Sequence, residues 1–564
     1  MEFITTNALA MTFLALLPIL SLLVLLVFVK TSVPKAGGIS LAVALVVALG
    51  FFGMPLTTGL PIAVGKALWL ALFVSLIVWG ALLLYHLVSD FGAINVINEN
   101  IKRFVKDKFV AFVLLAWLFT GLLQGIAGFG VPAVIVTPIL IALGFNPVKS
   151  LAAALLGHSW AVTFGSMGAA FFVIHGLTGV SLEDLGIPVW IFNAIGLFLT
   201  GVGVCWLSDG FAGVKKGLSY IIPVSAVMII VQYFTISFGM YALGGLNTAL
   251  AGLITMFALY KIRARGKEEK NTEVGFYKDK LNLGQAVFPY ALILMLLLSF
   301  QMIDLIDPTL RNRIGIAPNF SGWNYAYNPD FVEGAGVPRH IVCENSQVVH
   351  GEIKHGVMPA QNFNRIRLFV HPFLVLLLAS IAACIIYKRA GIWDKKIYSN
   401  ALKKTVQKGI PATLALLALG NMSLIMADSG MTNKLAYAIA DMVGPLFPLL
   451  SPFFGVLASF LTGNNTNANM LFGNFQYAIA SRLEMNTAVM SAAQSISASV
   501  GVAIGPTLIL MAALASDQKE KVSEVLKILI PLMLLIALVM GIVNFALLNL
   551  GLYEEVLRLL GRGV

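Results

Sequence analysis

Charged side chains are scarce in this chain. Lys, Arg, Asp and Glu make up 11% of its 564 residues, whereas soluble domains contain roughly 25%. Hydrophobic residues make up 59%, and the mean hydropathy is +0.90. A soluble core cannot bury that much apolar surface, so a set of soluble domains is excluded. The composition predicts an all-α polytopic membrane protein with about 12–16 spanning or half-spanning helices.

Cysteine is also scarce, and the usual motifs of catalysis are missing. Cys205, Cys343 and Cys384 lie far apart in the sequence, which argues against a disulfide framework or a zinc site. The chain contains no P-loop, and no Ser/His/Asp arrangement is visible, so ATP-driven transport and hydrolysis lack support. We therefore expect no enzymatic activity, no cofactor and no resident metal ion.

Basic residues outnumber acidic residues by 37 to 26, which gives a formal net charge of +11. In a membrane protein this excess indicates cytoplasmic loops rather than nucleic-acid binding, because Lys and Arg accumulate on the cytoplasmic side. Basic clusters lie in 89–108, 261–280 and 388–408, which we predict to be cytoplasmic. Residues 306–366 carry five acids against five bases and are predicted to be an extracytoplasmic insertion.

The apolar runs predict a multi-pass protein of the plasma membrane. In a cell with an inner and an outer membrane, this is the inner membrane. A first run is followed by Lys30 and Lys35, which indicates a spanning helix with an external N-terminus rather than a cleaved signal peptide. Sixteen apolar runs, each a crossing or half-crossing of the membrane, would place both termini outside the cell. The predicted organisation is N-terminal helices in 1–60, a first repeat core in 61–170, connecting helices in 171–305, the insertion in 306–366, a connecting helix and basic loop in 367–408, a second repeat core in 409–515 and a C-terminal helix in 516–564.

An internal repeat relates the two predicted cores. Residues 146–165 match 486–505 at an offset of 340 residues, and Asp90-x-Gly92 matches Asp428-x-Gly430 at an offset of 338. A basic cluster follows the helix that ends at Asp90 but precedes the helix that ends at Asp428. Equivalent helices should therefore cross the membrane in opposite directions. Such inverted-topology repeats are typical of carriers that alternate access to a central site.

Each repeat core contains one unusual polar or glycine-rich stretch between apolar runs. The first, 121–132, holds four glycines and a proline and cannot continue a regular helix. The second, 462–469, is rich in Asn and Thr, which are costly at membrane depth unless they line a wet cavity or a ligand. Helix N-termini at such breaks favour an anion. The predicted substrate-binding residues are Gln124, Gly125, Gly128, Gly130, His158, Ser159, Thr462, Gly463, Asn464, Asn465, Thr466 and Asn469.

At these two stretches the chain resembles the L-lactate/glycolate permease family of monocarboxylate–proton symporters. The first family signature corresponds to 127–132, followed by 162–168, and the second corresponds to 460–474. The resemblance implies a small 2-hydroxy monocarboxylate as substrate and H⁺ as the coupling ion. Apart from the substrate, we expect membrane lipids as partners and no nucleic acid. Whether the protein forms a homo-oligomer is left open.

The chain departs from the family pattern at ionisable positions. Where these permeases carry Glu, Asp and Lys, this chain has Gln124, Asn465 and Val502, and it adds His158 beside Ser159. We therefore consider His158 and Asp428 as candidates for proton coupling. Two alternatives remain open: a Na⁺-coupled carboxylate symporter, since neutral oxygens suffice for Na⁺, and an anion channel.

Overall fold

The structure is a computed structural model. It describes residues 8–561 apart from 58, 98–106, 127, 129, 265–280 and the parts of 307–370 that lie outside six short strands. Much of the first two predicted basic clusters and most of the predicted insertion therefore lie outside the described residues.

Helices make up the membrane part of the described chain. Before the insertion they are α2 (Ala8–Val27), α3 (Val33–Gly50), α4 (Gly59–Asp90), α6 (Lys108–Val113), the π-helix η1 (Leu114–Phe119), α7 (Thr120–Ile126), α8 (Val131–Ala142), α9 (Pro147–Ser159), α10 (Gly165–Thr178), α11 (Leu182–Ser237), the 3₁₀ helix η2 (Tyr241–Leu243), α12 (Gly244–Ala264) and α13 (Leu283–Ile306). After it they are α16 (Pro372–Arg389), α17 (Lys395–Asp428), α18 (Met431–Val443), η3 (Gly444–Leu446), α19 (Phe447–Thr462), α20 (Asn465–Arg482), α21 (Thr487–Gly501), η4 (Val502–Ile504), α22 (Pro506–Ala515), η5 (Lys519–Lys521), α23 (Val522–Asn549) and α24 (Leu552–Leu559).

Eleven helical segments among the described residues are long and apolar enough to cross a membrane, and four shorter apolar helices accompany them. Large apolar side chains on the outer helices are exposed, among them Phe13, Val46, Ile254 and Ile542. A soluble monomer rarely exposes so much apolar surface, whereas hydrocarbon tails cover it at no cost. The prediction of full spans mixed with half-spans is confirmed. Helix α11 is 56 residues long and leaves helical geometry only at Asp209 and Gly210.

The two longest repeat-equivalent helices, α4 and α17, run antiparallel. Lys66 near the start of α4 pairs with Asp428 at the end of α17, at 3.1 Å. Lys404 near the start of α17 pairs with Asp90 at the end of α4, at 2.7 Å. Both lysines, like both aspartates, are separated by 338 residues. The reciprocal pairs require opposite directions for the two helices, as the predicted inverted-topology repeat demands.

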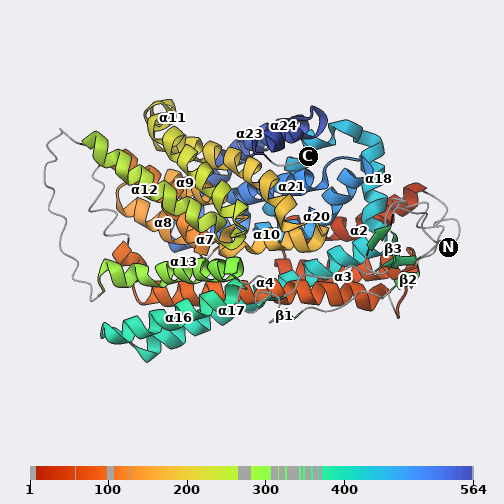
Figure 1. The fold of residues 1–564 in the computed structure, drawn as a ribbon, viewed down its shortest axis with the longest axis horizontal. Coiled ribbons are helices and arrows are strands. Elements are labelled where there is room, and N and C mark those ends of the chain that lie inside the picture. Colours follow the sequence, from red (N-terminus) through yellow and green to blue (C-terminus); the bar gives the residue numbers. More distant parts are fainter. Residues whose placement is uncertain are drawn as a thin grey trace.

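The two ends of the molecule differ in composition. Six short strands lie in the insertion: β1 (Gly315–Ile316) pairs with β6 (Ile366–Arg367), β2 (Asn324–Ala326) with β5 (Val357–Pro359), and β3 (Val342–Glu344) with β4 (Gln347–Val349). The all-α prediction is confirmed, and the six strands, of two or three residues each, are confined to the insertion. Figure 1 shows β2 and β3 at one end of the molecule and the turn between α16 and α17 at the opposite end.

Helices α4, α13, α16 and α17 lie along one side of the molecule, while α9 to α12 and α21 lie on the other (Figure 1). Within the second group, α9 crosses η1 at very short range. A methyl group added at Gly157 would collide with the Ala116 carbonyl, so only glycine fits at this crossing.

Candidate functional site

The first predicted helix break is present between α7 and α8. Gly130 is the N-cap residue of α8 with φ 83°, and Gly128 has φ 59°. Both lie in the left-handed region that glycine adopts at low cost. Ala127 and Phe129 of the family signature lie outside the described residues. The glycine-rich stretch therefore interrupts the helix between α7 and α8, as its sequence predicts.

The second break is shorter than its sequence suggests. Gly463, with φ 76°, ends α19, and α20 begins two residues later. The Asn464 side chain caps α20 by accepting a hydrogen bond from the Asn467 N–H at 2.8 Å. Most of the Asn/Thr run therefore forms the first turns of a buried helix. The start of an 18-residue helix presents further unpaired N–H groups, which favour an anion.

The turn after α9 contacts both breaks. On one side, Asn465 Nδ2 donates to Thr163 Oγ1 at 2.9 Å. On the other, the backbone passes so close to the first break that a methyl group at Gly165 would collide with the Gln124 amide. Ser166 in the same turn has φ 48° and lies against Gly128. One turn of the first repeat thus joins the two predicted binding stretches.

The turn that starts α22 also reaches both breaks, from the second repeat. A methyl group at Gly505 would lie 3.1 Å from Gly463 Cα, and one at Gly130 would collide with Leu508. The two breaks therefore lie near each other, on either side of these turns. The sequence predicted this meeting of the repeats, although neither turn was among the predicted site residues.

A buried polar network ties the breaks to α21. The Thr163 N–H donates to Ser499 Oγ at 3.1 Å, and the Thr163 hydroxyl donates to the Ser495 carbonyl at 3.0 Å. Asn469 Nδ2 donates to Ser495 Oγ at 2.9 Å and to the Ala170 carbonyl at 3.1 Å. Thr163 and Ser495 were not predicted as site residues. Thr163 lies within the repeated segment 146–165, and its place in that repeat could have indicated it as a site residue.

Three side-chain oxygens at this site have no hydrogen-bond donor among the described residues. Gln124 Oε1, Asn465 Oδ1 and Asn469 Oδ1 are buried and unpartnered, although the amide nitrogens of Asn465 and Asn469 are hydrogen-bonded. A buried acceptor without a donor costs about 1–3 kcal/mol. A ligand that carries a hydroxyl group would satisfy such an acceptor. Thr466, on the first turn of α20, is also buried.

Three further predicted site residues make contacts within the framework around the breaks. Gly125 lies against the backbone of Leu246 on α12. Thr462 Oγ1 donates to the Ala458 carbonyl at 2.8 Å within α19. Ser159 Oγ donates to the Leu156 carbonyl at 2.7 Å within its own helix. Each of the two hydroxyl oxygens can still accept a hydrogen bond while it donates to its own helix.

His158 is fully buried on α9. Its Nδ1 lies 2.8 Å from the Ala154 carbonyl, and its Nε2 has no partner in the part of the chain that the structure describes. No hydrogen bond joins it to the described residues of either break. His158 therefore has one unpartnered ring nitrogen inside the membrane part, without a direct contact to the Asn/Thr helix.

Asp428, the other predicted coupling residue, is buried and ion-paired. Its side chain and that of Lys66 are 11% and 5% exposed, respectively. Lys66 was missed by sequence reasoning. The repeat offset that relates Asp90 to Asp428 also relates Lys66 to Lys404, and that coincidence was the signal that could have found it.

In the part of the chain that the structure describes, no group of three His, Cys, Asp or Glu side chains is arranged to hold a metal ion. The polar groups at the breaks are neutral amides and hydroxyls, which suit hydrogen bonding to a small polar ligand.

Comparison with the sequences of known proteins identifies the family of this chain. The family model of L-lactate permease matches residues 11–551. An L-lactate permease of Bacillus subtilis is 25% identical over 96% of both chains. The glycolate permease GlcA of Escherichia coli is 24% identical over 94% of both chains. Among solved structures, the YdaH transporter of Alcanivorax borkumensis aligns over 86% of both chains with a TM-score of 0.43 and 13% identity. With eleven apolar segments long enough to cross a membrane, this multi-pass membrane protein belongs to the L-lactate permease family.

Proposed function

We propose that this protein is a secondary carrier for a small 2-hydroxy monocarboxylate, lactate or glycolate, and that it transports the anion with H⁺. Its relatives are named L-lactate permease and glycolate permease, which supports this substrate class. The observation that carries the location of the site is the meeting of both helix breaks at the turn around Thr163. Inverted repeats around such a site suit alternating access.

The chemistry of the site matches the two polar groups of the substrate. The carboxylate would bind at the N-terminal turn of α20, where backbone N–H groups and the Thr466 hydroxyl are available as donors. The substrate hydroxyl would donate to an acceptor that has no donor among the described residues, such as Gln124 Oε1 or Asn465 Oδ1. Neutral donors bind the anion without introducing a fixed charge into the membrane.

Removal of one of these groups tests the location of the site. Asn465→Ala removes both an acceptor and the hydrogen bond to Thr163. The loss of about 1–2 kcal/mol of binding free energy should lower the apparent affinity for L-lactate by roughly 5- to 30-fold. Asn544→Ala is the matched control. Asn544 is another buried asparagine, on α23, whose Nδ2 donates at 3.0 Å and whose Oδ1 is unpartnered. Uptake into proteoliposomes measures both variants. Equal affinity in the two would move the site away from α20.

Proton coupling is proposed to depend on His158 rather than on Asp428. Protonation of Asp428 would leave the buried Lys66 charge unpaired, which is costly. His158 has an Nε2 without a partner among the described residues, so it can take up a proton without leaving a neighbouring charge unpaired, and histidine is the side chain that most often carries protons in proteins. H⁺ that travels with a monocarboxylate moves no net charge.

His158→Gln tests this step, because Gln is polar but does not titrate. Accumulation of lactate driven by a pH gradient should be lost, whereas exchange of labelled for unlabelled lactate should continue, since exchange needs no net proton movement. A variant that still concentrates lactate on a pH gradient alone would refute the role of His158. Accumulation by the wild type on a Na⁺ gradient, at clamped pH, would refute proton coupling itself.

A further inference from the structure

A groove lies between α4, α16 and the start of α17, away from both helix breaks. Its volume is about 470 Å³. Leucine and isoleucine make up half of the side chains that line it, including Leu83 and Leu87 from α4 and Leu377 and Ile381 from α16. The outer side of α16 is open to the surroundings, with Ile381 49% exposed. Within the membrane part, such a surface is in contact with lipid.

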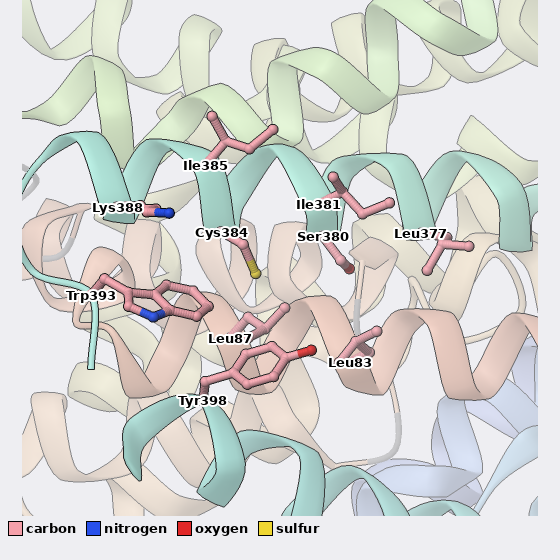
Figure 2. Close-up of a pocket in the computed structure, with 10 residues that line it drawn as sticks. All are labelled: Leu83, Leu87, Leu377, Ser380, Ile381, Cys384, Ile385, Lys388, Trp393 and Tyr398. Carbon is pink, nitrogen blue, oxygen red and sulfur yellow. The ribbon is translucent and has the colours of Figure 1, made fainter. Parts of the chain in front are cut away.

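The groove changes from apolar to polar along α16. Figure 2 shows Leu377 and Leu83 at one end, and Lys388 and Trp393 at the other. The polar end adjoins the turn between α16 and α17, in the basic segment 388–408 that we predict to be cytoplasmic. From Leu377 to Lys388 the helix rises about 16 Å, close to half of the roughly 30 Å hydrocarbon thickness of a bilayer. The groove therefore has the depth of one leaflet.

Aromatic rings hold the polar end in place. Trp393 stacks on Phe91, with ring centroids 5.5 Å apart and an angle of 16° between the planes. Phe91 also stacks on Tyr387 at 4.9 Å, and Tyr398 lies 5.2 Å from Trp393. Trp and Tyr prefer the interface between hydrocarbon and water. This end of the groove is thus a rigid platform at headgroup depth.

The charge at the polar end is positive and available. Lys388 and Arg389 are exposed, and Lys388 forms no ion pair with the described residues. The nearby acid, Asp394, accepts a hydrogen bond at 2.6 Å from the backbone N–H of Lys396 as a helix cap. Lys404 is already paired with Asp90. An anionic group would therefore find an unpaired cation at Lys388.

We propose that this groove binds one anionic phospholipid of the cytoplasmic leaflet. Its phosphate would pair with Lys388 beside Trp393, and one acyl chain would lie along the leucine and isoleucine side chains between α4 and α16. A free phosphate ion has no acyl chain and would leave the apolar part of the groove unfilled. Basic pockets between membrane helices on the cytoplasmic side bind lipid headgroups in this way. The proposal depends on membrane insertion and not on the transported substrate.

Native mass spectrometry of the purified protein with added lipid tests the proposal. The wild type should retain one phosphatidylglycerol about fivefold more than phosphatidylcholine, the factor that one basic residue near an anionic surface supplies. Lys388→Gln should remove this preference. Lys519→Gln, at another exposed lysine, should leave it unchanged. Cys384→Phe places a bulky ring inside the groove and should lower retention of both lipids, with an unchanged elution volume in gel filtration as the check on folding.

Four results would overturn the proposal. They are equal retention of the two lipids by the wild type, equal loss in the two lysine variants, full retention by Cys384→Phe, and displacement of the lipid by millimolar inorganic phosphate. A dimer that is lost in Cys384→Phe would assign the groove to a second copy of the chain instead.

Discussion

The ion pair between Lys66 and Asp428 gives the sharpest test of the packing between the repeats. Both side chains are nearly inaccessible, at 5% and 11% exposure, so Asp428→Asn leaves an uncompensated buried cation. Removal of one partner of a buried pair costs about 3–5 kcal/mol. In the repeat-equivalent pair the Lys404 side chain is 42% exposed. Asp90→Asn should therefore cost only about 0–1 kcal/mol, as for pairs that water can reach.

A double-mutant cycle measures the pair directly. Lys66→Met keeps the length of the side chain and removes its charge, so the double variant Lys66→Met, Asp428→Asn should be more stable than the sum of the single losses predicts. A coupling of about 1–3 kcal/mol is expected for residues in contact. Equilibrium unfolding in mixed detergent and dodecyl sulfate micelles provides the free energies. Additive single losses, or equal losses for Asp428→Asn and Asp90→Asn, would refute the assignment of a buried, reciprocal pair.

Two further predictions concern topology and packing. In a cysteine-free background, single cysteines at Lys108 and Lys403 should both react with a membrane-impermeant maleimide only from the cytoplasmic side; external labelling of either would contradict the inverted repeat. Gly157→Ala should destabilise the protein by about 1–3 kcal/mol in the same unfolding assay, because its methyl group meets the Ala116 carbonyl. Gly38→Ala, where nothing lies within 4 Å of the added methyl, should cost nothing, and equal effects of the two alanines would contradict the close crossing.

The membrane architecture was largely predictable because it depends on composition and on strong local signals. Glycine at Gly128, Gly130 and Gly463 marks positions with positive φ, which other residues rarely adopt. The direction of the repeats followed from basic clusters alone, and the reciprocal ion pairs of α4 and α17 agree with it.

The missing parts of the prediction depend on contacts between distant segments. Lys66 precedes its partner by 362 residues, and a single lysine in an apolar run gives no local sign of that partner. Thr163 lies in a turn where Ser166 and Met167 have positive φ, a conformation that tertiary packing imposes rather than the residues themselves.

Counterflow in proteoliposomes tests the central claim most directly, that the chain is a carrier for a small 2-hydroxy monocarboxylate. Liposomes preloaded with unlabelled L-lactate or glycolate should take up labelled L-lactate faster than empty ones, with a transient overshoot. Propionate, which lacks the hydroxyl group that the unpartnered acceptors would bind, should accelerate uptake much less. Uptake that is indifferent to internal lactate and glycolate would contradict the account.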